Sequence, residues 1–297
     1  MSILVAGSTG LLGGEIARRL AQKGKQVRGL VRATSDASSI EGLRGVGVDV
    51  VEGDLKDRPS LDRACRGIDT VISTVTTMPA PKQPGDGIAA VDQAGQISLV
   101  DAAAQEGVKQ FVYVSYSGKV EDDGPLTLAK RTVEGHLRRS GLTYTILRPC
   151  YFMELWLGPA VGFDYPNSKA TIYGSGENRM SWISAFDVAS VAVEVVDNPA
   201  ARDQVLELGG PESVTPHEVV RIFEEIGGRK FDVQHVPEQA LQAQQAAAVD
   251  EFQKTFPALM LHYARGDEID MSQTGRAFPF KLTSVREYAS RVLATPA

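Results

Sequence analysis

The chain has 297 residues, of which 43% are hydrophobic and 23% are charged, so it holds enough apolar material for a sizeable core and is not a disordered sequence. Its formal net charge of -6 and its pI of about 5.4 argue against non-specific binding to nucleic acid or to anionic membranes. Cys65 and Cys150 lack C-x-x-C spacing and the four histidines lie far apart, so we predict neither disulfides nor a metal site.

The sequence offers no sign of a targeting or membrane segment. It contains no run of about 18 apolar residues, and the run from Ile3 to Ala6 is too short for a signal-peptide core. We therefore expect a cytoplasmic protein without membrane insertion, whose partner is a small molecule and not nucleic acid.

The first half of the chain alternates between short β-rich runs and helical patterns. Strands are predicted at 3–6, 26–31, 49–52, 70–73, 111–115 and 144–147. Helices are predicted at 12–23, 59–66, 92–106 and 126–140, and Gly24, Gly107 and Gly141 mark the ends of three of them. Because strands that alternate with helices form parallel sheets, the sequence predicts an α/β fold with a Rossmann-like, doubly wound parallel sheet.

The second half is less regular. Loops are marked at 158–159, 165–167 and 174–176. A helix at 185–196 and a strand at 205–208 predict a return to the sheet, capping patterns predict helix starts at Thr215 and Ser284, and the Gln- and Ala-rich run 238–253 favours one helix. We expect an NADP-binding domain at 1–155, rejoined by 179–212, and a smaller, interleaved region at 156–297.

The most informative motif is the glycine-punctuated turn after the first strand. A pyrophosphate can approach the main chain closely only where no Cβ intervenes, and the N–H groups at a helix start then meet it with partial positive charge. Such a triplet alone can simply relieve crowding, but here a strand precedes it and a helix follows. The predicted diphosphate site consists of Gly7, Ser8, Thr9, Gly10, Leu11, Leu12 and Gly13.

The end of the second strand predicts which dinucleotide binds. NAD-selective sites carry an acidic residue about 20 residues past the glycine turn, whereas this chain has Arg32 there, followed by Ala33, Thr34 and Ser35. An arginine suits a 2′-phosphate through charge-assisted hydrogen bonds, so we favour NADP(H). The alternatives are that Arg32 is an ordinary surface charge and that Asp36 weakens the preference.

Two further strand ends lie at the same predicted edge of the sheet. Asp54, followed by Leu55, could accept a hydrogen bond from the adenine amine, or it could cap the next helix. Thr74, Val75 and Thr76 offer hydroxyl and main-chain groups beside a ribose, although a simple turn explains them nearly as well.

Several segments of the chain resemble one family. They are 5–13, 53–55, 111–115, 130–134, 145–149 and 183–189. On these segments the chain resembles the NmrA-like atypical short-chain dehydrogenase/reductase proteins, which are similar to isoflavone-reductase-like enzymes and to NADPH-dependent quinone reductases. The resemblance implies NADP(H) as the cofactor and a small C-terminal region that covers the nicotinamide and the substrate.

The catalytic residues depart from the pattern of the wider superfamily, which uses a serine and a Tyr-x-x-x-Lys pair. Ser115 and Lys130 match, but Leu126 occupies the tyrosine position. As in the isoflavone-reductase-like pattern, Lys130 could hold the ribose and deliver a proton, with Tyr116 or Tyr151 beside it, because burial lowers the pKa of a lysine. Alternatively, Lys130 and Glu134 form an ordinary surface pair on a helix.

The residues after the sixth strand, Pro149, Tyr151 and Phe152, could wall the cofactor and a flat apolar or aromatic substrate, or pack in the core. Two functions follow. The chain is expected to be an NADPH-dependent oxidoreductase that reduces a quinone, carbonyl or activated alkene by hydride transfer. The alternative is a non-catalytic, NADP(H)-binding redox sensor or assembly factor that acts on a protein partner.

Overall fold

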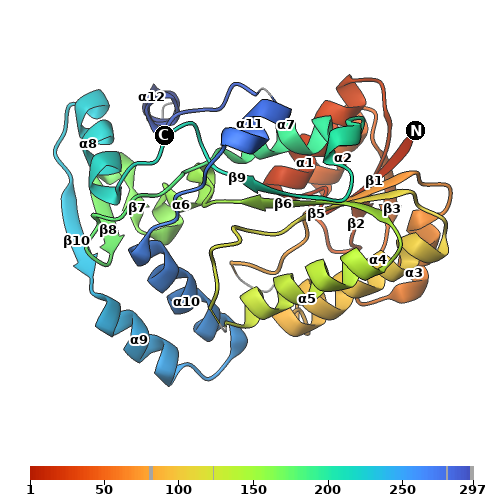
Figure 1. The fold of residues 1–297 in the computed structure, drawn as a ribbon, viewed down its shortest axis with the longest axis horizontal. Helices are drawn as coiled ribbons and strands as arrows, with labels where there is room; N and C mark the ends of the chain where they lie inside the picture. Colours follow the sequence, from red (N-terminus) through yellow and green to blue (C-terminus); the bar gives the residue numbers. More distant parts are fainter. Residues whose placement is uncertain (80–82, 123, 279, 295–297) are drawn as a thin grey trace. The chain divides into compact units, whose positions relative to one another are not determined.

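The computed structural model describes residues 1–79, 83–122, 124–278 and 280–294 (Figure 1). The chain folds into two compact units that interleave along the sequence. Unit 1 comprises Met1–Ser115, Pro125–Leu147 and Ala189–Leu206, and unit 2 comprises Tyr116–Gly124, Arg148–Val188 and Glu207–Ala297. No helix in the described ranges is long and apolar enough to cross a membrane.

A seven-stranded sheet with the order β3-β2-β1-β4-β5-β6-β9 organises unit 1. Its strands are β1 (Ser2–Ala6), β2 (Gln26–Val31), β3 (Asp49–Glu52), β4 (Thr70–Ser73), β5 (Gln110–Val114), β6 (Thr143–Pro149) and β9 (Gln204–Leu208). The pairings from β3 to β6 are parallel, with Ile3 opposite Val27 on one side and Thr70 on the other. The strand order reverses at β1, so the carboxyl ends of β1 and β4 flank the switch point at which α/β sheets bind ligands.

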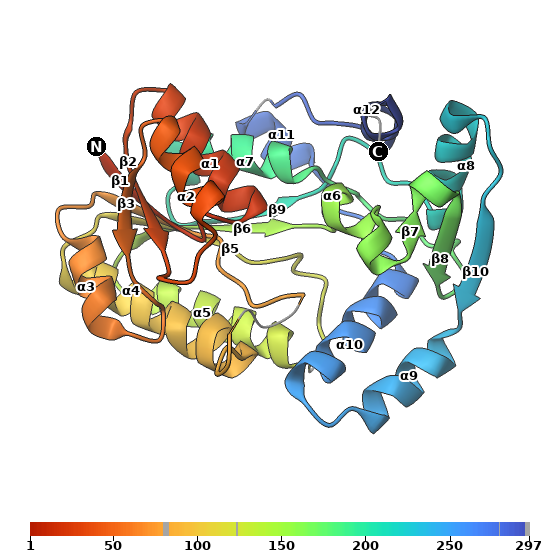
Figure 2. The same cartoon turned by 180° about the vertical axis from the view of Figure 1, so that it is seen from behind.

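Helices cover both faces of this sheet. Figures 1 and 2 show α1, α2 and α7 on one face and α3, α4 and α5 on the other. The helical elements are α1 (Leu11–Gln22), α2 (Ala37–Gly45), α3 (Arg58–Cys65), the π-helix η1 (Ile88–Gly95), α4 (Gln96–Gln105), α5 (Pro125–Arg139), α7 (Ala185–Glu194) and the 3₁₀ turn η4 (Pro199–Ala201). The sheet is buried from both sides, and the side chains of Val5, Ile72 and Val112 are 0% exposed. The predicted Rossmann-like sheet is therefore confirmed, including the return of the chain through β9.

Unit 2 is built around a small sheet with the order β10-β8-β7. Its elements are α6 (Met153–Trp156), η2 (Pro159–Val161), β7 (Phe163–Asp164), η3 (Tyr165–Asn167), β8 (Lys169–Tyr173), α8 (Pro216–Gly227), β10 (Asp232–Val236), α9 (Glu238–Ala247), α10 (Glu251–Arg265), α11 (Ser272–Ala277) and α12 (Val285–Ala294). Aromatic rings fill its interior, and Trp182 meets Tyr263 edge to face at 5.7 Å between centroids. The capping box predicted at Thr215 is present, and Ser284 exchanges equivalent hydrogen bonds with Glu287.

The structure corrects several predicted elements. The single helix expected at 238–253 is two helices, because Asp250 accepts a hydrogen bond from the Gln253 N–H at 2.8 Å and starts α10, which leaves Val249 84% exposed. The helix expected from Asp92 begins earlier, at Ile88, and its first eight residues are π-helical. The strands β8 and β10 and the helix α2 are elements that the sequence patterns did not indicate.

Both cysteines are free and buried. Cys65 is the last residue of α3 and is 0% exposed, and Cys150 follows β6 and is 5% exposed. Burial raises the pKa of the Cys65 thiol to about 12, and burial, helped by Asp267, raises the pKa of the Cys150 thiol well above its usual value.

Candidate functional site

The turn between β1 and α1 is packed too tightly for side chains at two of its glycines. Gly7 has a φ of 84°, in the left-handed region, and a Cβ there would lie 2.5 Å from Thr74 Oγ1. A Cβ on Gly13 would lie 2.6 Å from the same oxygen and would overlap the Gly7 carbonyl. Thr74 in turn donates from both its N–H and its hydroxyl to the Ala6 carbonyl, at 3.0 and 3.2 Å. The turn therefore rests directly on the residue that follows β4.

The outer side of the same turn is open. The buried hydroxyl of Ser8 donates to the Leu30 carbonyl at 3.0 Å and ties the turn to β2. By contrast, Thr9 and Gly10 are exposed, and Leu11 is 54% exposed although it is apolar. The helix α1 starts at Leu11 without a side-chain cap, so its first N–H groups remain available to an anion. Leu12 and Gly13 lie beneath this surface and are buried.

A cavity of about 160 Å³ lies at the carboxyl ends of β2 and β3. It is lined by Arg32, Ala33, Thr34, Glu52, Gly53, Asp54, Asp57, Ser60, Arg63 and Gln83. Asp54 does not cap α3. Its carboxylate accepts from the Lys56 N–H at 2.8 Å instead, and the next residue, Leu55, is buried in the core. The structure thus brings Arg32 and Asp54 to the wall of one hollow.

The segment after β4 presents main-chain and hydroxyl groups. Gln96 donates to the Val75 carbonyl at 2.9 Å, whereas Thr76 is exposed and accepts from the Met78 N–H at 3.2 Å. Thr77 donates from its N–H and its hydroxyl to one carboxylate oxygen of Asp92, at 3.0 and 2.5 Å. The other oxygen of Asp92, Oδ1, is buried and makes no hydrogen bond among the described residues.

Lys130 lies inside unit 1. It is 5% exposed, and its ammonium donates to the Val114 carbonyl at 3.2 Å and lies 5.1 Å from the centre of the Tyr113 ring. Burial lowers the pKa of Lys130, while the charges of Asp92 and Glu134 oppose that shift. A lysine held in this way is suited to proton transfer, because it loses its proton more readily than a solvated one.

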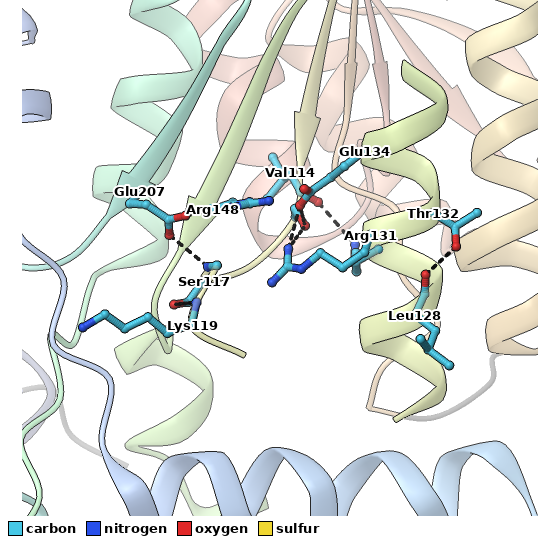
Figure 3. A network of polar contacts seen from close by, with 12 residues as sticks. Val114, Ser117, Lys119, Leu128, Arg131, Thr132, Glu134, Arg148 and Glu207 are labelled. Atoms are coloured by element: carbon cyan, nitrogen blue, oxygen red, sulfur yellow. Dashed lines mark hydrogen bonds and ion pairs between the residues drawn. The ribbon is translucent and has the colours of Figure 1, made fainter. Parts of the chain in front are cut away.

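Ser115 and Glu134 belong to a second buried contact. The Ser115 hydroxyl donates to Glu134 Oε1 at 2.6 Å, and Arg131 pairs with the same carboxylate oxygen at 2.7 Å (Figure 3). Glu134 is 2% exposed. The idea that Lys130 and Glu134 form a surface pair is therefore wrong. Leu126, which stands in the tyrosine position, is itself buried on α5.

The remaining predicted residues belong to unit 2. Tyr116 is half-buried. The Tyr151 hydroxyl donates to the Leu259 carbonyl at 2.9 Å, and burial raises the pKa of this phenol well above its usual value. Tyr151 is 6% exposed and stacks on His262, so it packs in the core of unit 2 and does not wall an open cleft.

The main chain around these residues is also engaged. Pro149 is buried, and its carbonyl accepts from the Ser117 N–H at 2.9 Å. Phe152 precedes α6 and pairs with Ile183 in an isolated bridge. Beside them, Glu207 accepts from the Gly118 N–H at 3.0 Å and from Arg148 at 3.0 Å (Figure 3).

Sequence reasoning missed three charged residues of unit 1, namely Lys56, Asp86 and Asp92. Asp86 pairs with both Arg32 and Lys56, and the charge of Asp92 acts to raise the pKa of Lys130. Lys56 and Asp86 were not indicated because they sit in loops without a local motif. At Asp92 the sequence pattern indicates only the start of a helix.

Comparisons with known proteins agree with this architecture. A model of the NmrA-like family matches residues 1–289. A (4-alkanoyl-5-oxo-2,5-dihydrofuran-3-yl)methyl phosphate reductase of Streptomyces griseus is 33% identical over 76% of this chain and 74% of its own length. The photosystem II assembly factor Ycf39 of Cyanophora paradoxa is 30% identical over 80% of this chain and 72% of its own. In one further relative, a chloroplastic protein of Arabidopsis thaliana, the match spans only 58% of that protein.

Among solved structures, the NADPH complex of an NADPH-dependent quinone oxidoreductase from Escherichia coli superposes with a TM-score of 0.79. The two chains are 20% identical, and the match covers 98% of this chain and 99% of that one. At this level of identity the comparison shows a common fold.

Proposed function

Because the chain belongs to the NmrA-like family, we propose that it is an NADPH-dependent oxidoreductase that reduces a quinone, a carbonyl or an activated alkene. The observation that carries the proposal is the bare turn after β1, where Gly7 and Gly13 leave no room for a Cβ and the first turn of α1 is uncapped. Such a surface fits a diphosphate. The nicotinamide of a bound NADPH supplies a hydride.

The residues that would hold the dinucleotide come from four loops of unit 1. The turn 7–13 would bind the diphosphate through its N–H groups, and Arg32 would bind the 2′-phosphate. Asp54 would accept from the adenine amine, while the groups of 74–76 would meet a ribose. Leu55 and Ser115 would support the dinucleotide-binding surface from its buried side, because both side chains are buried.

Lys130 is the residue proposed to handle protons. One of the three donors of its ammonium is engaged by Val114, which leaves two for a ribose hydroxyl and a substrate oxygen. Tyr116 is the phenol that the sequence favours, because it directly follows Ser115, whereas the Tyr151 hydroxyl donates to the Leu259 carbonyl. The reductase name of the Streptomyces griseus relative supports the proposed class of reaction.

A turnover experiment tests the proposal. NADPH oxidation is followed at 340 nm with a panel of quinones, aldehydes and enones, and deuterium transfer from 4-deuterated NADPH is scored in the product. The expected result is label in the product of at least one class. Tight NADPH binding with no substrate-dependent NADPH oxidation across the panel would refute an enzymatic role, and lasting label is expected only in products of carbonyls and enones, because deuterium on a quinol oxygen exchanges with water.

A second candidate function is a non-catalytic NADP(H) sensor or assembly factor. It is favoured by Leu126 in the tyrosine position and by the relative named as a photosystem II assembly factor. Its signature would be a protein partner whose affinity differs between the NADP⁺-bound, NADPH-bound and free forms. Pull-downs with the three forms would reveal such a difference, and equal recovery in all three would count against this function.

A further inference from the structure

Two cations of unit 1 share one buried carboxylate. Arg32 Nη1 lies 2.7 Å from Asp86 Oδ2, and Lys56 Nζ lies 2.6 Å from Asp86 Oδ1. The Asp86 side chain is 1% exposed, whereas the side chains of Arg32 and Lys56 are 33% and 30% exposed. The Asp86 carboxylate is therefore buried beneath the side chains of Arg32 and Lys56, which lie between it and the solvent.

The charges of this group do not cancel. Burial raises the pKa of Asp86, but hydrogen bonds from Lys56 and Arg32 outweigh it, and the pKa lies below its ordinary value. One ionised carboxylate faces two cations, so this group of three carries one net positive charge, beside the carboxylates of Glu52, Asp54 and Asp57 that also line the cavity. Binding both cations to one anchor also fixes their spacing, which lowers the entropy that a ligand must remove from two long side chains.

The donors that remain point to an anion. A guanidinium has five N–H donors and an ammonium has three, and the only hydrogen bonds that Arg32 and Lys56 donate from their side chains within the described ranges go to Asp86. Arg32 also lines the cavity at the ends of β2 and β3. Lys56 comes shortly after two of the lining residues in the sequence, Gly53 and Asp54. A phosphate monoester, with three acceptor oxygens and a charge near -2, is the ligand that two such cations suit.

We propose that Lys56 is a second specificity-determining residue, which binds the 2′-phosphate of NADPH together with Arg32, and that Asp86 is the positioning residue that holds the two cations side by side. This inference rests on the proposed function. It assigns to Lys56 a role in binding the 2′-phosphate that no sequence motif indicates.

The test compares NADPH and NADH affinities by calorimetry for the wild type and for Lys56→Ala, Lys56→Arg and a control, Lys25→Ala. Lys25 is a matched control because it also pairs with a carboxylate, Asp197 at 2.7 Å, and its side chain is 24% exposed, but it precedes β2 at the opposite end of the strand. Adenosine 2′,5′-bisphosphate and adenosine 5′-phosphate serve as smaller probes of the same difference.

Lys56→Ala is expected to weaken NADPH and the bisphosphate about 10-fold, with NADH and adenosine 5′-phosphate changed less than about twofold, because one charge-assisted hydrogen bond is lost. Lys56→Arg should restore most of the loss, and Lys25→Ala should show none. Unchanged NADPH affinity in Lys56→Ala, or an equal loss for both dinucleotides, overturns the inference.

Three other outcomes would also decide the matter. A selective loss in Arg63→Ala without one in Lys56→Ala would move the phosphate to the other basic residue of the cavity and overturn the assignment of Lys56. If the wild type binds NADH and NADPH equally, the inference fails while dinucleotide binding stands. If it binds neither, the proposed function fails and the inference fails with it.

Discussion

Gly13→Ala is the substitution that most directly probes the bare turn. The added Cβ would lie 2.6 Å from Thr74 Oγ1. An ordinary carbon–oxygen contact is about 3.5 Å, so the two atoms must separate by about 1 Å. The obstructing groups are the Gly7 carbonyl and a threonine hydroxyl fixed on Ala6, and neither is the free end of a flexible side chain.

The expected cost follows from this rigidity. Overpacking a close-packed site costs about 1–3 kcal/mol of unfolding free energy. A turn displaced by about 1 Å also misplaces its N–H groups, and we expect NADPH affinity to fall about 10-fold or more. Thr74→Ala in the same chain removes one of the two obstructions, so the double variant should recover part of the stability.

Urea unfolding and calorimetric NADPH titration measure both effects. Gly42→Ala is the control, because it lies in α2 with no atom within 4 Å of its added Cβ. That variant should be more stable by about 0.5–1 kcal/mol, as expected for alanine in a helix. If Gly13→Ala unfolds like the wild type and binds NADPH normally, the turn between β1 and α1 does not require a glycine at position 13.

Lys130→Met should lower kcat about 100-fold or more while the Kd for NADPH changes only a few-fold, as seen by steady-state kinetics beside titration; a kcat within threefold of the wild type would exclude Lys130 from proton transfer. Asp92→Asn removes a charge that raises the pKa of Lys130, so that pKa falls further, and activity that needs the ammonium should be lost at a lower pH on the alkaline side of the pH–rate profile. An unmoved alkaline limb would contradict the coupling. Tyr151→Phe should cost about 1 kcal/mol of stability through its lost hydrogen bond to Leu259 and leave kcat unchanged, whereas Tyr116→Phe should lower kcat; the reverse pattern would exchange their roles.

The parts of the fold that were predictable are those encoded by neighbouring residues. The strands of the large sheet are short apolar runs bounded by glycines and helical patterns, and the spacing of the glycines predicts the turn 7–13. Arg32 was identified because it follows a strand at a fixed distance from that turn. Local sequence is sufficient in such cases, since the constraint acts within one βα unit.

The parts that were missed depend on residues far apart in the chain. Asp86 meets Arg32 across 54 positions and Lys56 across 30, and no local pattern foretells either contact. The burial of Glu134 likewise depends on Ser115, 19 residues earlier. In α2 only Leu43 is buried, so the helix lacks the apolar stripe by which helices are found in sequences.

Helix boundaries were missed for a different reason. The run 238–253 is rich in strong helix formers, and their intrinsic preference hides the break at 248–250. The signal was present in Asp250, whose side chain caps α10, but a capping residue among helix formers is easily read as an interior position.

The buried cysteines make this protein convenient to label. Alkylating reagents attack thiolates, and Cys65 and Cys150 are both withdrawn from solvent and hold their protons at neutral pH. A single cysteine introduced at an exposed position such as Thr34, on the rim of the cavity, would therefore take up a maleimide fluorophore selectively while the native pair is left in place.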